Sequence, residues 1–306
     1  VFLAVFVIAK VGYNASLIFY DSMLVDITDH DRMDVVSSYG YAWGYIGSCV
    51  PFVISLVFVL MYEKIGITMG MAMMLAFFLN AAWWFLVTIP LLKKYKQVNY
   101  AQMPTHPVRD SFRRLINTLK DIKAEKNIFL YLLSFFLFID GVYTIIEMAT
   151  AYGSALGLDS TGLLLALLVT QIVAFPCALI FARCSKKYET DLLIKICIAA
   201  YTGIALFAIQ LDKQWEFWLL AVLVGMFQGA IQALSRSYFA KIIPAEKAGE
   251  YFGIYDICGK GASFLGTTLV GVIAQLTNVA NAGVAMITVL FVIGFVLFCK
   301  AAKLNK

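Results

Sequence analysis

The sequence predicts an all-α, polytopic membrane protein: a helix bundle with about nine transmembrane helices. Composition is the first reason, because 62% of the 306 residues are hydrophobic and only 14% are charged. Soluble domains average about 45–50% apolar and about 25% charged residues, so much of this surface requires lipid as its solvent. The second reason is that the apolar residues form long blocks. The third is that the basic residues gather in alternate connections between those blocks.

Each block has about the twenty residues that an α-helix needs to span a bilayer. Most blocks are apolar all round, so length identifies them better than periodicity does. Long strands are excluded as an alternative, because open sheet edges cannot lie in hydrocarbon. The nine blocks cover residues 1–20, 39–62, 65–92, 128–150, 161–183, 191–211, 215–235, 252–276 and 281–301.

The polar segment 93–127 divides the chain into 1–92, with three blocks, and 128–306, with six. It carries nine Lys or Arg residues, which places it on the cytoplasmic side. With that side fixed, the predicted inner connections and their boundary residues hold 19 of the 24 basic residues. The predicted outer connections hold only Lys64 and Lys213. We therefore expect the N-terminus outside and the C-terminus inside.

Within this segment, residues 108–123 predict an amphipathic helix at the inner membrane surface. Its apolar residues recur at helical spacing, with basic residues around them. An interdomain tether is the favoured interpretation, and a lipid-regulatory or calmodulin-like site is the alternative. The apolar positions are Phe112, Leu115, Ile116, Leu119 and Ile122.

Polar residues inside the apolar blocks are the candidates for function, because a buried charge in a membrane is costly and usually faces a cavity or a partner. Asp140 stands twelve residues beyond Ile128, or about 18 Å into the membrane at 1.5 Å per residue. Glu147 follows two turns later on the same face. Two further pairs, each one turn apart, are Lys10 with Asn14 and Gln228 with Gln232. Helix–helix hydrogen bonds, or a pair of Asp140 with Lys10 or another cation, are the structural alternatives.

The block that holds the two glutamines also carries Gly225 and Gly229 at G-x-x-x-G spacing. Small residues at this spacing let a second helix approach closely. We therefore expect a close helix contact there.

Catalytic and cofactor-binding patterns are missing from the sequence. His30 and His106 lie in separate loops, and no H-E-x-x-H or G-x-S-x-G occurs. The six cysteines form no C-x-x-C pair, and most lie in apolar blocks, which indicates buried thiols rather than disulfides or a metal site. Residues 253–261 resemble a phosphate-binding loop only superficially, and Lys260 fits better as an i, i+4 partner of Asp256. We expect no enzyme activity, no cofactor and no metal. A net charge of +5, spread between apolar blocks, gives no reason to expect nucleic acid.

Several motifs carry a resemblance to a known family. They are Gly229-Ala-Ile-Gln-Ala-Leu-Ser-Arg-Ser-Tyr-Phe-Ala-Lys-Ile-Ile-Pro244, Gly249-Glu-Tyr-Phe-Gly-Ile-Tyr255, Gly259-Lys260, Tyr13-Asn14 and Val36-Ser-Ser-Tyr-Gly-Tyr-Ala-Trp-Gly-Tyr-Ile-Gly47. Together they resemble the vacuolar amino-acid effluxer-like branch of the major facilitator superfamily. The resemblance implies twelve helices in two six-helix halves, with the nine blocks as helices four to twelve. The segment 93–127 would then be the linker between a partial N-terminal half and a complete C-terminal half.

The resemblance also implies where a substrate cavity lies. In that superfamily the first, fourth, seventh and tenth helices line the cavity near the midplane. Three of them correspond to 1–20, 128–150 and 215–235. The implied cavity residues are Lys10, Asn14, Asp140, Glu147, Gln228 and Gln232, with Asp140 and Glu147 as candidates for proton coupling.

A cytoplasmic gate is implied by the same symmetry. The loop after the first block carries five aspartates, and the equivalent loop 236–251 carries three basic residues. We expect Asp21 and Arg236, at helix ends, to contribute more than the mid-loop carboxylates, which water screens.

The resulting expectation is a secondary transporter of a small polar solute, with amino-acid efflux and proton coupling as the specific hypotheses. Its partners would be the lipid bilayer, the solute and protons, and its location a bacterial cell membrane or a eukaryotic vacuolar or other internal membrane. A non-transporting membrane subunit or receptor with a relic cavity is the alternative.

Overall fold

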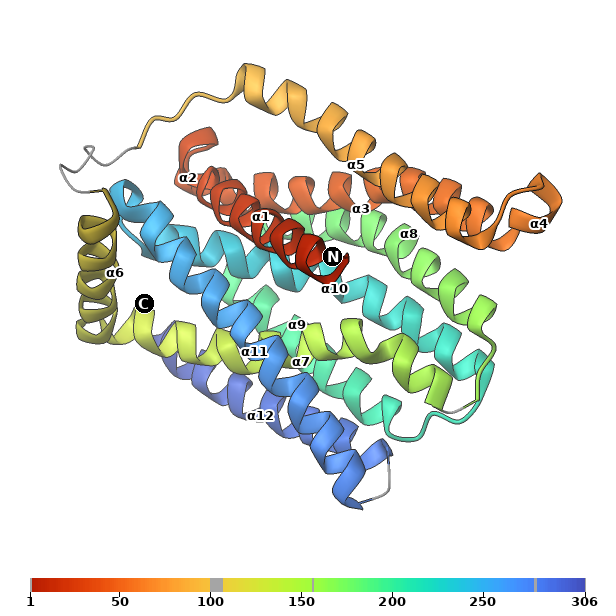
Figure 1. Ribbon diagram of the computed structural model, residues 1–306. Helices are drawn as coiled ribbons and strands as arrows, with labels where there is room; N and C mark the ends of the chain where they lie inside the picture. Colours follow the sequence, from red (N-terminus) through yellow and green to blue (C-terminus); the bar gives the residue numbers. More distant parts are fainter. Residues whose placement is uncertain (1, 100–106, 156, 278–279, 306) are drawn as a thin grey trace.

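The helices of the computed structural model follow the predicted blocks. The structure describes residues 2–99, 107–155, 157–277 and 280–305. Within these ranges nine helical segments are long and apolar enough to cross a membrane, as block length predicted. Figure 1 shows the long helices packed side by side as a bundle. They are α1 (Phe2–Ser22), α3 (Met33–Leu60), α5 (Met69–Lys94), α7 (Lys126–Ala155), α8 (Ser160–Cys184), α9 (Thr190–Ala208), α10 (Gln214–Ile242), α11 (Ala248–Thr277) and α12 (Ala280–Leu304).

The helix α3 begins earlier than the sequence predicted. Its first residue is Met33, whereas the apolar block starts at residue 39. The extra turns contain Asp34 and Ser37, which are polar but buried against other helices. Short elements precede it, α2 (Leu24–Ile27) and a 3₁₀ turn at His30–Arg32, and α4 (Tyr62–Ile65) follows it. A second 3₁₀ turn, Ala245–Lys247, leads into α11.

The helices from α7 onward enclose an aromatic core. The ring of Tyr131 packs against Phe239 and Phe298, with ring centroids 5.8 and 6.2 Å apart. Its hydroxyl donates to the carbonyl of Ser235 at 2.7 Å, so the polar end of this fully buried side chain is satisfied. Buried aromatic side chains provide large apolar contact area in fixed geometry. Tyr255 of α11 stacks on Phe135 and Phe239 in the same core. The core therefore fixes the positions of α7, α10 and α11, whose other faces form the site.

Small residues allow α10 to approach its neighbours as the G-x-x-x-G spacing predicted. A Cβ on Gly225 would lie 2.7 Å from the backbone oxygen of Thr170 on α8. A Cβ on Gly229 would lie 2.9 Å from the ring of Tyr45 on α3. The two glycines therefore place α10 against both α8 and α3, which brings the early helices onto the later ones.

One end of the bundle carries α2, α6 (Pro107–Ala124) and the C-terminus (Figure 1). This is the end that the basic residues predict to face the cytoplasm, and we call it the inner end. The predicted amphipathic helix is present as α6, which lies across the bundle end. Thr118 donates to Glu250 at 2.5 Å, and Lys247 pairs with Asp121 at 2.9 Å. These contacts tie α6 to the start of α11, and the exposed Phe112, Ile116 and Leu119 give it the apolar stripe of a helix at the membrane surface.

Candidate functional site

A cavity of about 630 Å³ lies between α1, α7 and α11, with side chains of α3 and α10 completing its wall. A second chamber of about 450 Å³ adjoins it on the side of α3, α8 and α10. The two chambers are parts of one polar space, because they share seven lining residues: Tyr13, Leu17, Tyr20, Tyr41, Tyr143, Glu147 and Gln232. This volume is in the range of ordinary small-molecule sites.

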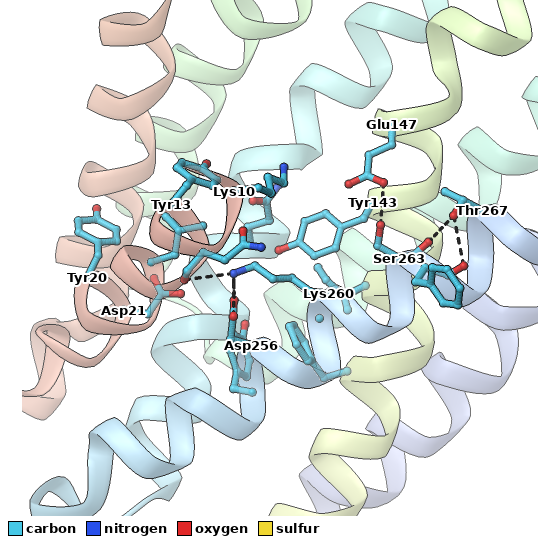
Figure 2. Close-up of a pocket in the computed structure, with 18 of the residues that line it drawn as sticks. Lys10, Tyr13, Tyr20, Asp21, Tyr143, Glu147, Asp256, Lys260, Ser263 and Thr267 are labelled. Carbon is cyan, nitrogen blue, oxygen red and sulfur yellow. Dashed lines mark hydrogen bonds and ion pairs between the residues drawn. The ribbon is translucent and has the colours of Figure 1, made fainter. Parts of the chain in front are cut away.

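Most of the predicted cavity residues meet in this space. Lys10, Asn14, Glu147 and Gln232 line the larger chamber, and Gln228 lines the second. They come from α1, α7 and α10, the three helices that the family resemblance assigned to the cavity. Figure 2 shows Lys10 and Glu147 on opposite sides of Tyr143.

Asp140 is the predicted cavity residue that the structure places elsewhere. It does not line either chamber, and its side chain is almost fully buried between α7 and α11. Its Oδ1 accepts from the backbone nitrogen of Gly266 at 3.0 Å and from Thr144 at 3.4 Å. Asp140 and Glu147 do share one face of α7, but α11 covers that face at Asp140 and leaves Glu147 open. The pair of Asp140 with Lys10, named as a structural alternative, is not formed.

Glu147 accepts a hydrogen bond from Ser263 of α11 at 2.7 Å, within the cavity wall (Figure 2). Lys10 lies over the ring of Tyr13, 5.6 Å from its centroid. In the second chamber the buried oxygens Gln171 Oε1 and Gln228 Oε1 have no hydrogen-bond partner among the described protein atoms. Buried acceptors without a partner are costly, so these two oxygens are available to a polar solute or to water.

The helix α11 contributes a wall that sequence reasoning missed. Lys260 and Asp256 do form the predicted i, i+4 ion pair, with Nζ 2.6 Å from Oδ1, but the pair lines the cavity. Lys260 also donates to the backbone oxygen of Asn14 on α1 at 3.4 Å. The superfamily pattern did not assign this helix to the cavity. A lysine inside an apolar block was the available signal, since such a charge usually faces a cavity.

At the inner end of the cavity the structure brings the predicted gate residues together. Arg236 Nη1 donates to Asp21 Oδ1 at 3.0 Å, and the two side chains are 4% and 17% exposed. The guanidinium also donates to Ser37, through Nε to Oγ at 3.0 Å and through Nη2 to the backbone oxygen at 3.3 Å. The rings of Tyr20 and Tyr41 lie 5.0 Å from its central carbon. One residue of α10 therefore binds both α1 and α3.

A second ion pair nearby was not predicted. Lys241 Nζ lies 2.6 Å from Asp34 Oδ2, and Thr190 and Ser237 each donate to the same carboxylate at 2.6 Å. Asp34 is one of the five aspartates after the first block, where the sequence analysis expected water to screen the mid-loop carboxylates. It is buried because the first turns of α3, which hold it, pack against α10 and the start of α9.

The Asp26 carboxylate also accepts hydrogen bonds from the protein and is not simply screened by water. It accepts from the Tyr95 hydroxyl at 2.5 Å and from the backbone of Asn99 at 2.8 Å. Burial and this carboxylate together raise the pKa of Tyr95 to about 12. The mid-loop carboxylates Asp29 and Asp31 are exposed, as expected. Within the described part of the chain no three His, Cys, Asp or Glu side chains gather closely enough to hold a metal ion.

A bundle of membrane-length helices with a polar cavity between them is the architecture of membrane transporters. A solved structure of the same fold is the human organic anion transporter MFSD10, with a TM-score of 0.58 at 15% sequence identity. The match covers 91% of this chain and 66% of that one. The nine membrane-length helices of the described residues mark a multi-pass membrane protein, and the chain shares the fold of that transporter.

The family follows from sequence comparison. The family model described as "Vacuole effluxer Atg22 like" matches residues 1–303, so the chain belongs to the Atg22-like family. The chain is 43% identical to the uncharacterized MFS-type transporter YxiO of Bacillus subtilis, covering 95% of this chain and 69% of that protein. It is 25% identical to autophagy-related protein 22-1 of Penicillium rubens, over 78% of this chain and 44% of that protein.

The comparisons bear on the predicted class and location. The family is one of transporters rather than enzymes, as the sequence analysis expected. Relatives in a bacterium and in fungi fit the two membranes predicted. The chain spans 69% of the length of the Bacillus relative and less than half of the Penicillium one.

Proposed function

We propose that this chain forms most of a secondary transporter that moves a small polar solute by alternating access. The observation that carries the proposal is the cavity between α1, α7 and α11, which is lined by acidic and basic side chains. Arg236 bonds α1 and α3 to α10 at the inner end of the cavity, and we assign the cytoplasmic gate to this contact. In the proposal, residues 1–92 and 128–306 move relative to each other about this cavity. The arrangement corresponds to a state that is closed to the cytoplasm.

Amino acids are the solute class that the site supports best. Lys10 and Lys260 supply positive charge to the wall, and Glu147 and Asp256 supply negative charge. A solute with a carboxylate and an ammonium group can satisfy both signs without bringing net charge into the membrane. The family description, a vacuole effluxer, supports export as the direction.

The test is counterflow by the complete encoded protein in liposomes. Liposomes are loaded with an excess of one of the twenty standard amino acids, and uptake of the same labelled amino acid is followed. Transient accumulation above the protein-free level is expected for at least one amino acid. A protein that binds an amino acid without counterflow would instead be a receptor or a non-transporting subunit.

Proton coupling is the finer part of the proposal, and we assign the coupled proton to Glu147. This carboxylate lies in the wall of both chambers, among Tyr13, Tyr143, Gln232 and Ser263. Asp140, the other candidate of the sequence analysis, is covered by α11 and lines neither chamber. A carrier of the coupled proton has to exchange it with the space that the solute enters.

We therefore expect Glu147→Gln to abolish uptake driven by a pH gradient while leaving solute counterflow measurable. Glutamine keeps the size and the hydrogen-bond acceptor for Ser263 but cannot exchange a proton. Asp140→Asn is the matched variant, on the same helix face two turns away, and we expect it to keep pH-driven uptake. Loss of pH-driven uptake in Asp140→Asn alone would return the coupling role to Asp140.

A further inference from the structure

An ion pair in a cavity wall requires an explanation beyond helix stability. The side chains of Asp256 and Lys260 are 15% and 32% exposed, and both line the larger chamber. Elsewhere, Lys195 and Asp191 of α9 form an i, i+4 pair of similar length and exposure that lines neither chamber. Ion pairs between side chains four residues apart on one helix add little to the stability of that helix. Stability alone therefore gives little reason for two charges in the membrane interior.

The other charged side chains of the larger chamber already have partners of a different kind. Asp21 is held by Arg236, Glu147 by the Ser263 hydroxyl, and Lys10 lies over Tyr13. Among the described lining residues, Asp256 and Lys260 differ from these because each is the other's ion-pair partner and both side chains line the chamber. Figure 2 shows Lys260 reaching from α11 toward α1, with Asp256 directly beneath it.

The surroundings suit a small amphipathic solute. Phe135, Tyr143 and Tyr255 are among the aromatic residues of the same wall. The Lys260 ammonium is also bonded to the backbone oxygen of Asn14, so it touches α1 as well as α11. A ligand that moves this ammonium changes a contact between the early and the late helices.

We propose that the Asp256–Lys260 pair binds the two charged ends of a zwitterionic solute. The solute carboxylate bonds to Lys260, and its ammonium bonds to Asp256. Insertion replaces one ion pair by two, so no charge is left unpaired in the low-dielectric cavity. The inference rests on the proposed function, and it names the residues that select the solute.

The experiment measures ligand preference by the purified complete protein. The twenty standard L-amino acids are tested singly, and the tightest binder is compared with its methyl ester and with its des-amino acid. The ester lacks the negative charge, and the des-amino acid lacks the positive one. Preference is a ratio within one variant, so a lower folded fraction does not affect it.

In the unaltered protein we expect the amino acid to bind at least about tenfold more tightly than either analogue, since charge-assisted hydrogen bonds are the strong ones. Lys260→Gln is expected to lose the preference over the ester and to keep the preference over the des-amino acid. Asp256→Asn is expected to do the reverse. Lys195→Gln, from the matched pair on α9, is expected to keep both preferences.

Two outcomes overturn the inference while leaving the proposed function intact. One is that Lys260→Gln still prefers the amino acid over its ester. The other is that Lys10→Gln, on the α1 side of the cavity, loses the preference for the amino acid over its ester. If the unaltered protein binds none of the twenty amino acids, the amino-acid proposal itself fails, and the inference fails with it.

Discussion

Replacing Asp21 with arginine is expected to open the inner end of the transporter. The change places two guanidinium groups where Arg236 and Asp21 now lie 3.0 Å apart, in a contact that is mostly buried. Breaking a buried ion pair by removing one partner costs about 3–5 kcal/mol. A change of about 5.5 kcal/mol turns a 99:1 ratio of two states into 1:99, so about half of that change makes the two states equal. We therefore expect most molecules to leave the closed state.

The distance across the inner end reports this change. Spin labels at residues 31 and 246, which are exposed in the turns before α3 and α11, should move apart in Asp21→Arg. Adding Arg236→Asp restores opposite charges and should recover part of the closed population. Recovery should be incomplete, because aspartate cannot reproduce the bonds of Arg236 to Ser37.

A matched control is available at the same end of the bundle. Asp121 and Lys247 form an inter-helix pair of nearly the same length, 2.9 Å, but both side chains are about half exposed. Such pairs contribute about 0–1 kcal/mol, so Asp121→Arg should leave the label distance unchanged. Equal distances in Asp21→Arg and the unaltered protein would mean that the Arg236 contact does not hold the inner end closed.

Replacing Gly266 with alanine is expected to destabilise the packing of α11 on α7. An added Cβ would lie 2.1 Å from Asp140 Oδ1 and 2.2 Å from Thr144 Oγ1. The Asp140 side chain is almost fully buried, so it has little room to move away. Overpacking a buried site costs about 1–3 kcal/mol, and loss of the bond from the Gly266 nitrogen to Asp140 would add to that.

Thermal unfolding of the purified complete protein measures this effect. Gly266→Ala should lower the melting temperature, and Asp140→Ala in the same chain should restore part of the loss by removing the obstructing carboxylate. Gly271→Ala is the control on the same helix, because nothing lies within 4 Å of a Cβ there. If Gly266→Ala melts like the control, α11 does not approach Asp140 as closely as described.

The membrane fold could be predicted because the bilayer sets a simple rule. Block length alone located the nine apolar helices, since hydrocarbon requires about twenty residues per crossing. The start of α3 could not be predicted by that rule. Asp34 and Ser37 look like loop residues in sequence, and only the partners on α9 and α10 make them suitable for a buried helix.

The site was predictable where charge and helix order sufficed. Asp21 stands at the end of α1 as expected, whereas Arg236 lies inside α10, which continues to Ile242 beyond the predicted block. The structure nevertheless places the two side chains in contact, as their charges predicted. Asp140 shows the limit of periodicity, which gives the face of a helix but not what covers it. The sequence analysis did not place α11 at the cavity. The spacing of Asp256 and Lys260 correctly predicted their ion pair, but spacing does not show that the pair borders a cavity.

The central claim is that the solute passes through the cavity between α1, α7 and α11. Counterflow by a cysteine-free form of the complete protein carrying Gln232→Cys tests it most directly, because this residue lines both chambers. A charged, membrane-impermeant thiol reagent should block counterflow, and the transported solute should slow the reaction. Lys64→Cys, in an exposed connection, should react without loss of transport. Undiminished counterflow after complete modification of residue 232 would contradict the account.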